Sequence, residues 1–494
     1  MEIISCQKVN FTYALSDKPV LHDVNFGIED GELCLVIGKS AAGKSTILKL
    51  LKKEIAPAGK LDGTLNIKQN VGYVSQNADE MPVCDKVRSE LSFGLTNLGL
   101  SKEEIELKVS ETAGYFNLDS KLDSDISSLS GGEKQILNLA SVMITKPEIL
   151  VLDEPTCQLD PVWAERFVNV IKKLNRDFGT TLIVAEHLLE EFYPYSDSIM
   201  LVENGTVEMK LSPDKMTEYL VKTNNDLIKS IPLSFRLFNA KGNISVCRNE
   251  LKKCNLTPLY DEKINSEIVL KVQNVVFGYN KNQDVINDLS LNVYKNKINV
   301  ILGANSSGKS TLLKLISKVL KPRYGKIKTK QCVSLLCQNP RDLFTHEKCC
   351  DETEFGELTD FLEINDIYNQ HPYDISGGQA QRLALAMVLG TGADLILLDE
   401  PTKALDTAFK HKLGEKLKEL CAMGKTVLLT THDVDFAGEY GECISFLSKG
   451  EIVTTRTCKE FFNSLDFFTT SVSKLTNGIA VGYVCEKNLE NINE

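Results

Sequence analysis

The chain carries one set of short motifs twice, in the same order. A phosphate-loop pattern, G-x-x-x-x-G-K-S-T, occupies 38–46 and again 303–311. The strings around it recur as the pairs VNFTY and VVFGY, LSGGEKQ and ISGGQAQ, ILVLDEPT and LILLDEPT, and AEH and TTH. Such self-similarity overrides the estimate of about three domains that chain length alone gives. The sequence therefore predicts two copies of one domain.

The two copies differ in one internal segment. Gln76 and Ser130 are 54 positions apart, whereas their counterparts Gln338 and Ser376 are 38 apart, so the second copy has lost 16 residues there. The recurring motifs place the domain boundaries. We assign the first domain to 1–211, a connecting region to 212–266, the second domain to 267–455 and a C-terminal tail to 456–494.

Each phosphate-loop pattern stands between a short apolar run and a leucine-rich helical pattern. The apolar runs, at 33–37 and 298–302, are typical of buried strands. In a strand, glycine loop and helix, backbone N–H groups wrap a nucleotide's phosphates and the helix N-terminus adds its positive end. The predicted phosphate contacts are Gly38, Lys39, Ser40, Ala41, Ala42, Gly43, Lys44, Ser45 and Thr46, and Gly303, Ala304, Asn305, Ser306, Ser307, Gly308, Lys309, Ser310 and Thr311.

Within these loops the lysine and the serine that follows it have separate roles. Lys44 and Lys309 are expected on the β- and γ-phosphates. Ser45 and Ser310 are expected to hold Mg²⁺ through their hydroxyl oxygens. A purely structural glycine turn is the alternative, but it does not explain two matches in matching contexts.

Two apolar runs, ILVLD and LILLD, end in paired carboxylates. A strand of that composition is buried on both faces, as in a parallel sheet, and its carboxyl end lies where α/β folds bind ligands. Asp153 and Asp399 are therefore expected on Mg²⁺. Glu154 and Glu400 are expected to orient and deprotonate an attacking water. The alternative for a lone Asp-Glu pair is a solvated strand end.

A histidine follows another apolar strand in each copy. His187 lies 34 residues after Asp153, and His432 lies 33 residues after Asp399. A lone histidine after a strand is more often structural, but this recurrence favours a contact with the terminal phosphate.

A serine and two glycines open a helical pattern in each copy, which predicts a second anion site at a helix N-terminus. A plain serine N-cap is the alternative. The residues concerned are Ser130, Gly131 and Gly132, and Ser376, Gly377 and Gly378.

Composition narrows the function classes. The net charge of −11 and the pI near 5.3 count against a protein that coats nucleic acid. The uncharged runs reach 11 residues, whereas a spanning helix needs about 20 apolar residues. Fourteen cysteines without a C-x-x-C pair are typical of reduced thiols in a cytosol. We expect a cytoplasmic protein.

Together, these motifs resemble two ATP-binding cassettes of ABC proteins, over roughly 10–210 and 270–455. The resemblance implies two tandem α/β P-loop NTPase cassettes, each with a mixed or parallel-sheet core and a helical subdomain, shortened in the second. It implies ATP and Mg²⁺, with Tyr13 and Tyr279 placed to stack on adenine. The resemblance also implies that Gln76 and Gln338 contact both Mg²⁺ and a transport partner. Finally, it implies head-to-tail pairing within one chain, so that each ATP lies between one phosphate loop and the other cassette's serine-glycine signature.

More narrowly, DEPTCQLDP and DEPTKALD resemble the same segments of fused energy-coupling factor transporter ATPases, as does SELSFGLTNLGLS at 89–101. That resemblance implies an importer of vitamins or metal ions. The implied partners are an integral membrane coupling subunit and a substrate-binding subunit, with no nucleic acid. The chain would then be peripheral on the inner face of the cell membrane, held there through its partners.

Two alternatives remain. One is the ATPase of another ABC importer, for sugars or peptides. The other is a soluble two-cassette ATPase associated with translation, whose family has a long basic linker. Here 212–266 carries nine Lys and Arg against six Asp and Glu.

Overall fold

A computed structural model describes residues 1–14, 16–157, 159–187, 189–238, 241–254, 256–261, 263–264, 266–280, 283–403, 405–466 and 468–492. Gln158 and Ala404, which belong to the two repeated Asp-Glu-Pro-Thr strings, lie outside these residues. The chain forms two compact units, Met1–Arg236 and Leu237–Glu494.

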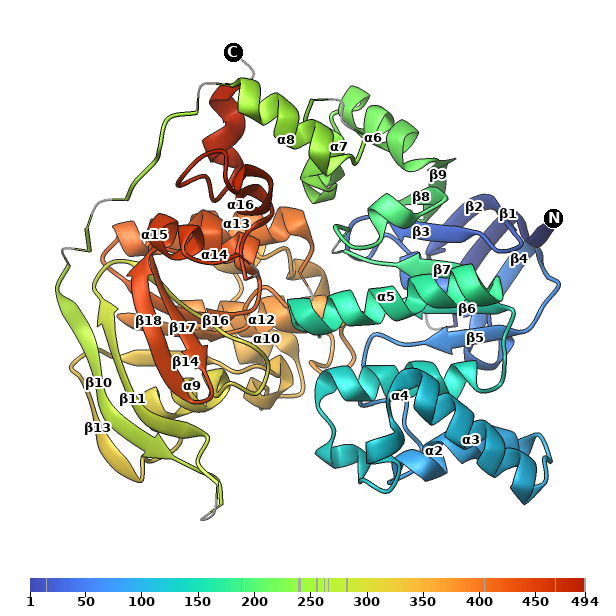
Figure 1. Cartoon of the computed structure of the whole chain (residues 1–494), viewed down its shortest axis with the longest axis horizontal. Coiled ribbons are helices and arrows are strands. Elements are labelled where there is room, and N and C mark those ends of the chain that lie inside the picture. The colour runs from blue at the N-terminus through green and yellow to red at the C-terminus, as the bar shows by residue number, and fades with distance from the viewer. Residues whose placement is uncertain are drawn as a thin grey trace. The chain divides into compact units, whose positions relative to one another are not determined.

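A six-stranded sheet forms the middle of the first unit, in the order β5-β6-β7-β3-β8-β9 (Figure 1). Its strands are parallel except for the antiparallel β8–β9 pair. They are β3 (Leu33–Ile37), β5 (Val71–Val74), β6 (Ile149–Asp153), β7 (Thr181–Ala185), β8 (Ser198–Glu203) and β9 (Thr206–Leu211). A second, antiparallel sheet has the order β2-β1-β4, with β1 (Glu2–Tyr13), β2 (Leu21–Glu29) and β4 (Gly59–Ile67).

Alternating side chains of β3 connect the layers of this unit. Leu33, Leu35 and Ile37 pack into one apolar core with the helices α4 and α5. Cys34 and Val36 point the other way, into a core shared with α1 and the antiparallel sheet. The period-2 geometry of a strand explains why a continuous apolar run is needed here.

The helices of the first unit are α1 (Lys44–Leu50), α2 (Val87–Asn97), α3 (Lys102–Phe116), α4 (Gly131–Met143), α5 (Pro161–Phe178), α6 (Pro213–Lys222) and α7 (Leu233–Arg236), with 3₁₀ turns η1 (Lys53–Ile55), η2 (Asp119–Lys121), η3 (Ile126–Ser128), η4 (Tyr193–Tyr195) and η5 (Asp226–Ser230).

The second unit repeats this architecture, with sheets β14-β15-β16-β12-β17-β18 and β11-β10-β13. The larger sheet contains β12 (Ile298–Leu302), β14 (Val333–Leu336), β15 (Leu395–Asp399), β16 (Thr426–Thr431), β17 (Cys443–Ser448) and β18 (Glu451–Thr457). The smaller one contains β10 (Ile268–Phe277), β11 (Ile286–Tyr294) and β13 (Tyr324–Thr329). The helices and turns are α8 (Ile244–Lys253), α9 (Lys309–Ile316), η6 (Pro340–Leu343), α10 (Cys349–Glu352), α11 (Glu357–Phe361), η7 (Asn365–Ile367), α12 (Gly377–Gly390), α13 (Thr407–Ala422), α14 (Val434–Tyr440), α15 (Cys458–Asn463), α16 (Ser471–Thr476) and η8 (Glu486–Ile492).

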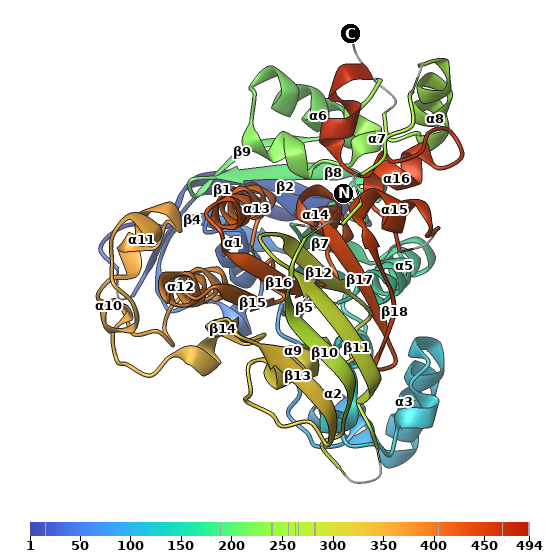
Figure 2. The same cartoon turned by 90° about the vertical axis from the view of Figure 1, so that its left-hand side faces the viewer.

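The predicted fold class is confirmed, including the shortened helical part of the second copy. The first unit has α2 and α3 between its loop glutamine and its signature serine, with 11 and 15 residues. The second has α10 and α11 there, with four and five residues. Figure 2 shows α10 and α11 as short turns, whereas α3 is a full helix. Shortening of these two helices therefore accounts for the difference in spacing between the two copies.

Residues 212–266 are divided between the two units. Helices α6 and α7 belong to the first unit, and α8 belongs to the second. In the second unit, α16 packs against α8, and α15 packs against α14. Among the described residues, no helix combines the length and the apolar character that crossing a bilayer requires.

Candidate functional site

The first phosphate loop connects β3 to α1. Lys44, only 5% exposed, donates hydrogen bonds from Nζ to the carbonyl oxygens of Gly38 at 2.8 Å and Lys39 at 2.9 Å. A Cβ added at Gly38 would lie 2.3 Å from the Val202 carbonyl oxygen, so no side chain fits there. Gly43, with φ of 103°, caps α1 in a left-handed conformation that glycine adopts freely. The loop therefore needs its glycines and wraps a buried ammonium group.

The second loop, between β12 and α9, has the same construction. Lys309 Nζ donates to the carbonyl oxygens of Gly303 at 2.8 Å and Ala304 at 3.2 Å. A Cβ at Gly303 would lie 2.4 Å from the Leu447 carbonyl oxygen, and Gly308 caps α9 with φ of 107°. The other predicted loop residues lie on the same two segments: Ser40, Ala41, Ala42, Ser45 and Thr46, and Asn305, Ser306, Ser307, Ser310 and Thr311.

Asp153 lies at the end of β6, beside the first phosphate loop. Ser45 Oγ donates to its Oδ1 at 3.0 Å, and the Tyr73 hydroxyl donates to its Oδ2 at 3.0 Å. Burial raises the pKa of Asp153, and the charge of Glu154 raises it further, against these two hydrogen bonds. Serine and carboxylate oxygens are the ligands that Mg²⁺ prefers, and a cation would relieve the cost of burying this charge. The residues therefore fit the predicted metal.

Asp399 occupies the same place at the end of β15. Thr430 Oγ1 donates to its Oδ1 at 2.6 Å. Burial raises the pKa of Asp399, while hydrogen bonds from Ser310 and Thr430 lower it. Because Ser310 is again the oxygen beside the carboxylate, the second donor set also fits Mg²⁺.

Glu154, the predicted base of the first copy, is held from two sides. His187 Nε2 lies 3.0 Å from its Oε1, and Gln76 Nε2 donates to its Oε2 at 2.7 Å. Its backbone has φ of 47°, a conformation that costs a glutamate about 1–3 kcal/mol and is typical of functional sites. Burial works to raise the pKa of Glu154, but the hydrogen bond and charge of His187, with the charge of Lys44, hold that pKa below its ordinary value. The carboxylate is therefore ionised and ready to accept a proton at neutral pH.

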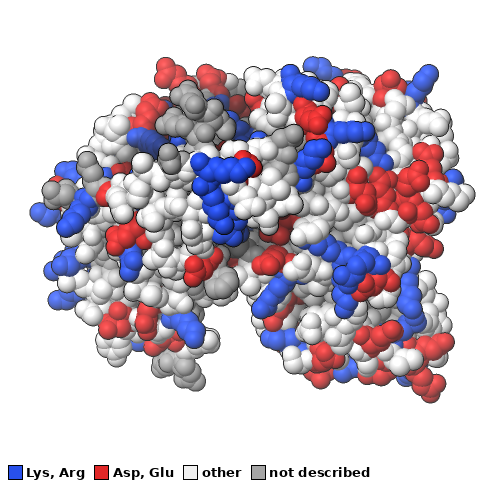
Figure 3. Space-filling view, turned by 45° about the horizontal axis from the view of Figure 1, so that its top comes forward, with Lys and Arg blue, Asp and Glu red and all other residues white. Residues whose placement is uncertain are grey.

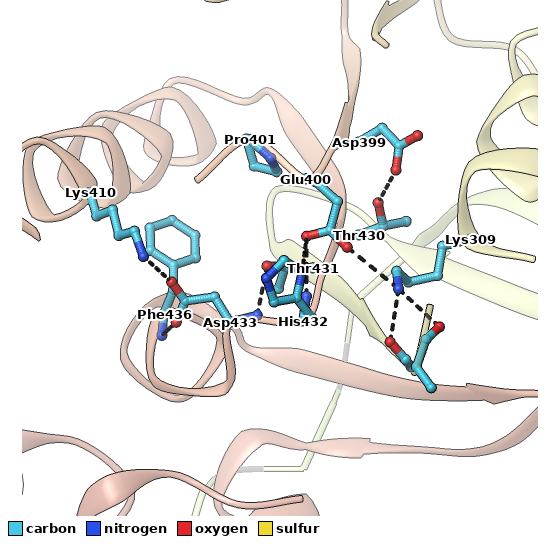
Figure 4. A network of polar contacts seen from close by, with 12 residues as sticks. Lys309, Asp399, Glu400, Pro401, Lys410, Thr430, Thr431, His432, Asp433 and Phe436 are labelled. Atoms are coloured by element: carbon cyan, nitrogen blue, oxygen red, sulfur yellow. Dashed lines mark hydrogen bonds and ion pairs between the residues drawn. The ribbon is translucent and has the colours of Figure 1, made fainter. Parts of the chain in front are cut away.

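Glu400 makes the corresponding contacts in the second copy (Figure 4). His432 Nδ1 lies 2.9 Å from its Oε2, the His432 backbone N–H donates to the same oxygen at 3.2 Å, and Lys309 Nζ lies 3.4 Å from Oε1. Its φ is 51°. Burial works to raise the pKa of Glu400, but His432 and Lys309 hold it below its ordinary value. Lysine, glutamate and histidine thus form one polar cluster in each unit.

The two loop glutamines are placed differently. Gln76 is half-buried and bonded to Glu154. Gln338 is exposed, and within the described part of the chain its side chain makes no hydrogen bond to Glu400. The structure therefore brings Gln76, but not Gln338, into contact with the predicted base.

The signature of the first copy begins α4. Ser130 is the N-cap, and it forms a capping box with Glu133. A Cβ at Gly131 would meet nothing within 4 Å, whereas one at Gly132 would lie 2.3 Å from the Trp163 ring. The open side of the helix N-terminus is therefore at Gly131, and Gly132 is needed for packing.

The second signature begins α12 in the same way. Ser376 is its N-cap and forms a capping box with Gln379. A Cβ at Gly377 would again meet nothing within 4 Å, and Gly378 follows it in the first turn. The serine is thus an N-cap in both copies, in agreement with the alternative of a plain serine N-cap. Head-to-tail pairing with the opposite phosphate loop stays a prediction.

The two tyrosines lie beside their phosphate loops. The Tyr13 hydroxyl is 2.8 Å from Thr46 Oγ1, and its ring packs edge-on against Phe11. The Tyr279 hydroxyl is 3.2 Å from Thr311 Oγ1. Both rings are exposed, which leaves a face for stacking.

Sequence reasoning missed several contacts that hold these sites together. Gln135 Nε2 donates to the Pro155 carbonyl oxygen at 3.1 Å, and Gln381 Nε2 donates to that of Pro401 at 3.2 Å. The last glutamine of each signature string is thus tied to the segment that follows the Asp-Glu pair. This glutamine recurs in LSGGEKQ and ISGGQAQ, and that recurrence could have indicated a structural role.

A buried carboxylate was also missed. Glu186, beside His187, accepts bonds from the Thr156 backbone at 2.9 Å, the Thr156 hydroxyl at 2.6 Å and the His187 backbone at 3.1 Å. Burial raises the pKa of Glu186 to about 7. The second copy has Thr431 at this position, so the repeat of motifs between the two copies did not single out Glu186.

One further contact is particular to the first unit. Lys39, on the phosphate loop, forms a 2.5 Å ion pair with Asp226 of η5. The second loop has Ala304 at the corresponding position. The segment after β9 thus touches the phosphate loop of its own unit.

Comparisons with known proteins agree with this geometry. The family model described as ABC transporter matches residues 21–157 and 286–403. A relative from Bacillus cereus, named "Putative ABC transporter ATP-binding protein", is 32% identical over 96% of this chain and 95% of its own length. A Bacillus subtilis protein named "Putative HMP/thiamine import ATP-binding protein" is 28% identical, over 90% of each chain.

Solved structures show the same fold at lower identity. An archaeal ribosome recycling factor, solved with a ribosomal stalk protein, has a TM-score of 0.65 and 21% identity, covering 92% of this chain and 91% of its own. A structure titled RNase-L Inhibitor has a TM-score of 0.64 and 20% identity, covering 93% and 92%. At such identity the likeness concerns the tandem-cassette fold alone.

Proposed function

The chain belongs to the ABC transporter family, as a two-cassette ATPase, and from this premise we propose that it is the ATP-hydrolysing subunit of a membrane importer. One observation carries the enzymatic part of the proposal. In both cassettes a buried lysine, an ionised glutamate and a histidine form one cluster beside the phosphate loop.

The chain's own residues divide the work in each site. The loop N–H groups and the lysine hold the phosphates of ATP, because the lysine ammonium already lies within the loop. Glu154 or Glu400 orients the attacking water and accepts its proton. His187 or His432 keeps that carboxylate in place and ionised. When bound, Mg²⁺ would be held by Ser45 and Asp153, or by Ser310 and Asp399, and would neutralise charge on the β- and γ-phosphate oxygens.

We assign the importer to the energy-coupling factor type, with vitamins or metal ions as substrates. The two Asp-Glu-Pro-Thr strings and the segment 89–101 support this subtype. The name of the Bacillus subtilis relative, which refers to thiamine import, supports it as well. The proposed partners are a membrane coupling subunit and a membrane substrate-binding subunit.

The helical part of the first cassette offers a surface for such a partner. Leu98, at the end of α2, is 63% exposed, and Leu107, on α3, is 71% exposed. Phe93, on α2, is also exposed. Exposed apolar side chains of this size are typical of a protein contact. We therefore place the coupling subunit on α2 and α3.

The test is fractionation of cells that produce the tagged full chain at native level. We expect it in the membrane fraction, together with integral membrane proteins that survive affinity purification. Leu107→Glu should abolish recovery of these membrane proteins with the chain, while its ATPase rate stays unchanged. The matched control is Val221→Glu, an exposed apolar residue on α6 that should have no effect.

The opposite outcome has a definite meaning. Cosedimentation with ribosomes, with no membrane protein recovered, would contradict the importer and favour the translation-associated alternative. ATP hydrolysis by the isolated chain would still hold in that case, so the enzymatic and transport parts are tested separately.

A further inference from the structure

A basic segment runs along one edge of the second cassette. Residues 317–332 contain six Lys and Arg and no Asp or Glu, in a chain whose net charge is −11. They follow the end of α9 and include the edge strand β13. The face of the molecule in Figure 3 mixes basic and acidic side chains. The segment is therefore a local exception to an acidic chain.

The strand register gathers the lysines on one face. Lys271 of β10 is directly opposite Lys328 of β13, and Gln273 is opposite Lys326. Lys326 and Lys328 are exposed, whereas Ile327 between them packs on the core of the sheet. Like charges directly opposite one another destabilise an antiparallel pair. An anionic partner would remove that cost.

A groove of about 970 Å³ separates these strands from the end of α9. Lys318 and Lys321 line its other wall. Its lining contains one acid, Glu267, which is bonded to Lys295 at 3.0 Å. Among the described residues, no carboxylate forms an ion pair with the six lysines of this groove, which are Lys271, Lys318, Lys321, Lys326, Lys328 and Lys330. We call these six residues the lysine face.

The first cassette shows that the fold does not require this charge. There Ser5 is opposite Asn66, and Gln7 is opposite Thr64. Alignment of VNFTY with VVFGY places Ser5 at the position of Lys271. Lysines on an edge strand also prevent aggregation, but that role does not extend to Lys271, which is on the central strand β10. The lysine face therefore belongs to the second cassette alone.

We propose that the lysine face binds the surface of a membrane rich in anionic phospholipid. Two features favour a membrane. Val319, between Lys318 and Lys321, is 67% exposed, and Ile268 on the groove wall is 43% exposed. Exposed apolar side chains among lysines suit the interface of a bilayer, where long lysine stems lie on apolar groups while the ammonium reaches phosphate.

The composition of the groove argues against nucleic acid. Single-stranded nucleic acid is held by aromatic side chains that stack on bases, together with arginine. The described lining contains neither. Arg323, next to the groove, is bonded to Asp284 at 2.7 Å. The proposal stands on this charge pattern and does not depend on the importer assignment.

The experiment is flotation of the purified full chain with vesicles of phosphatidylcholine alone or mixed with phosphatidylserine. We expect binding to the mixed vesicles only, weakened by salt. The triple substitution Lys271→Ser, Lys326→Thr and Lys328→Asn installs the residues of the first cassette. At about fivefold per lysine, it should weaken binding roughly 100-fold.

Matched variants separate the site from general charge. Lys53→Ser, Lys102→Ser and Lys222→Ser, three exposed lysines of the first unit, change the net charge equally and should leave binding unchanged. Ser5→Lys, Thr64→Lys and Asn66→Lys should create a second lysine face and strengthen binding. If the triple variant is unstable, Lys318→Ser with Lys321→Ser, outside the strands, tests the same groove.

Several results would overturn the proposal. These are equal binding to both kinds of vesicle, full binding by the triple variant, or equal loss in the charge-matched control. Tight binding of a single-stranded RNA that the triple variant abolishes, with vesicle binding unaffected, would assign the face to nucleic acid instead. The ATPase rate in solution should be the same for all these variants, which separates this test from that of the importer.

Discussion

The Tyr73 hydroxyl donates a 3.0 Å hydrogen bond to Oδ2 of Asp153. In the second cassette Leu335 stands at the position of Tyr73, and the corresponding bond to Asp399 comes from Thr430. The first cassette has Ala185 where the second has Thr430. The two sites therefore hold the same aspartate through side chains from different strands, β5 in one and β16 in the other.

Tyr73→Phe should weaken the predicted metal site of the first cassette. Losing a hydrogen bond to a charged group costs about 1.5–3 kcal/mol, so the Mg²⁺ concentration for half-maximal hydrolysis should rise about tenfold or more. The measurement is a Mg²⁺ titration of ATPase rate in a Glu400→Gln background, where only the first site turns over. Thr430→Val in a Glu154→Gln background is the matched experiment. An unchanged Mg²⁺ requirement in both would show that these bonds do not support the metal site.

Local patterns made much of the fold and site predictable. The strand, glycine loop and helix around Lys44 follow one another in the chain, so apolar runs and glycines were enough to place them. The shortened helices of the second unit followed from the spacing of Gln338 and Ser376.

Contacts that occur in only one of the two cassettes could not be predicted from the sequence. The bonds from Tyr73 and Thr430 join residues about 80 and 31 positions from their aspartates, and neither recurs in the other cassette. The opposition of Lys271 and Lys328 depends on strand register, which no motif specifies. Gln338 shows the converse: its motif recurs, but its contact with the glutamate does not.

Glu186 should make stability depend on pH. Burial raises its pKa to about 7, from the ordinary value of 4.5 that an unfolded chain retains. Between these values the folded state binds more protons than the unfolded state, so the free energy of unfolding falls as pH rises from about 4.5 to 7. The full effect is roughly 3 kcal/mol.

In the Glu186→Gln variant this position cannot titrate. The free energy of unfolding of the variant, relative to that of the parent chain, should therefore increase from pH 5 to pH 8. Chemical unfolding of both proteins across this range measures the difference. Parallel pH profiles for the two proteins would show that Glu186 is ionised in the fold and would contradict the assignment.

The two signature glycines should respond differently to alanine. At Gly132 the new Cβ meets the Trp163 ring at 2.3 Å, so Gly132→Ala should lower stability by about 1–3 kcal/mol. At Gly131 the Cβ has open space, so Gly131→Ala should keep full stability but slow ATP turnover, because the predicted approach of a phosphate to α4 is obstructed. Thermal unfolding and ATPase rate, measured on both variants, check this. Full activity of a stable Gly131→Ala protein would count against a phosphate site there.

The unequal helical parts should contact a membrane partner asymmetrically. With α2 and α3 reduced to α10 and α11, the second cassette cannot present the same groove. We expect cysteines introduced at Leu107 and at Glu357, in a chain cleared of its fourteen native cysteines, to crosslink to different partner segments. Mass spectrometry of the crosslinked peptides identifies those segments. Crosslinks from both positions to one repeated partner surface would contradict the asymmetry.

The central claim is that one chain carries two hydrolytic ATP sites, with Glu154 and Glu400 as their bases. The most direct test is ATP binding and turnover by Glu154→Gln, Glu400→Gln and the double variant. Glutamine keeps the size and shape of each side chain but cannot accept the proton of water. We predict intact ATP binding in all three, turnover slowed by roughly 10²–10⁴-fold at each altered site, and no hydrolysis above background in the double variant. Hydrolysis at the parent rate by either single variant would contradict the role assigned to that glutamate.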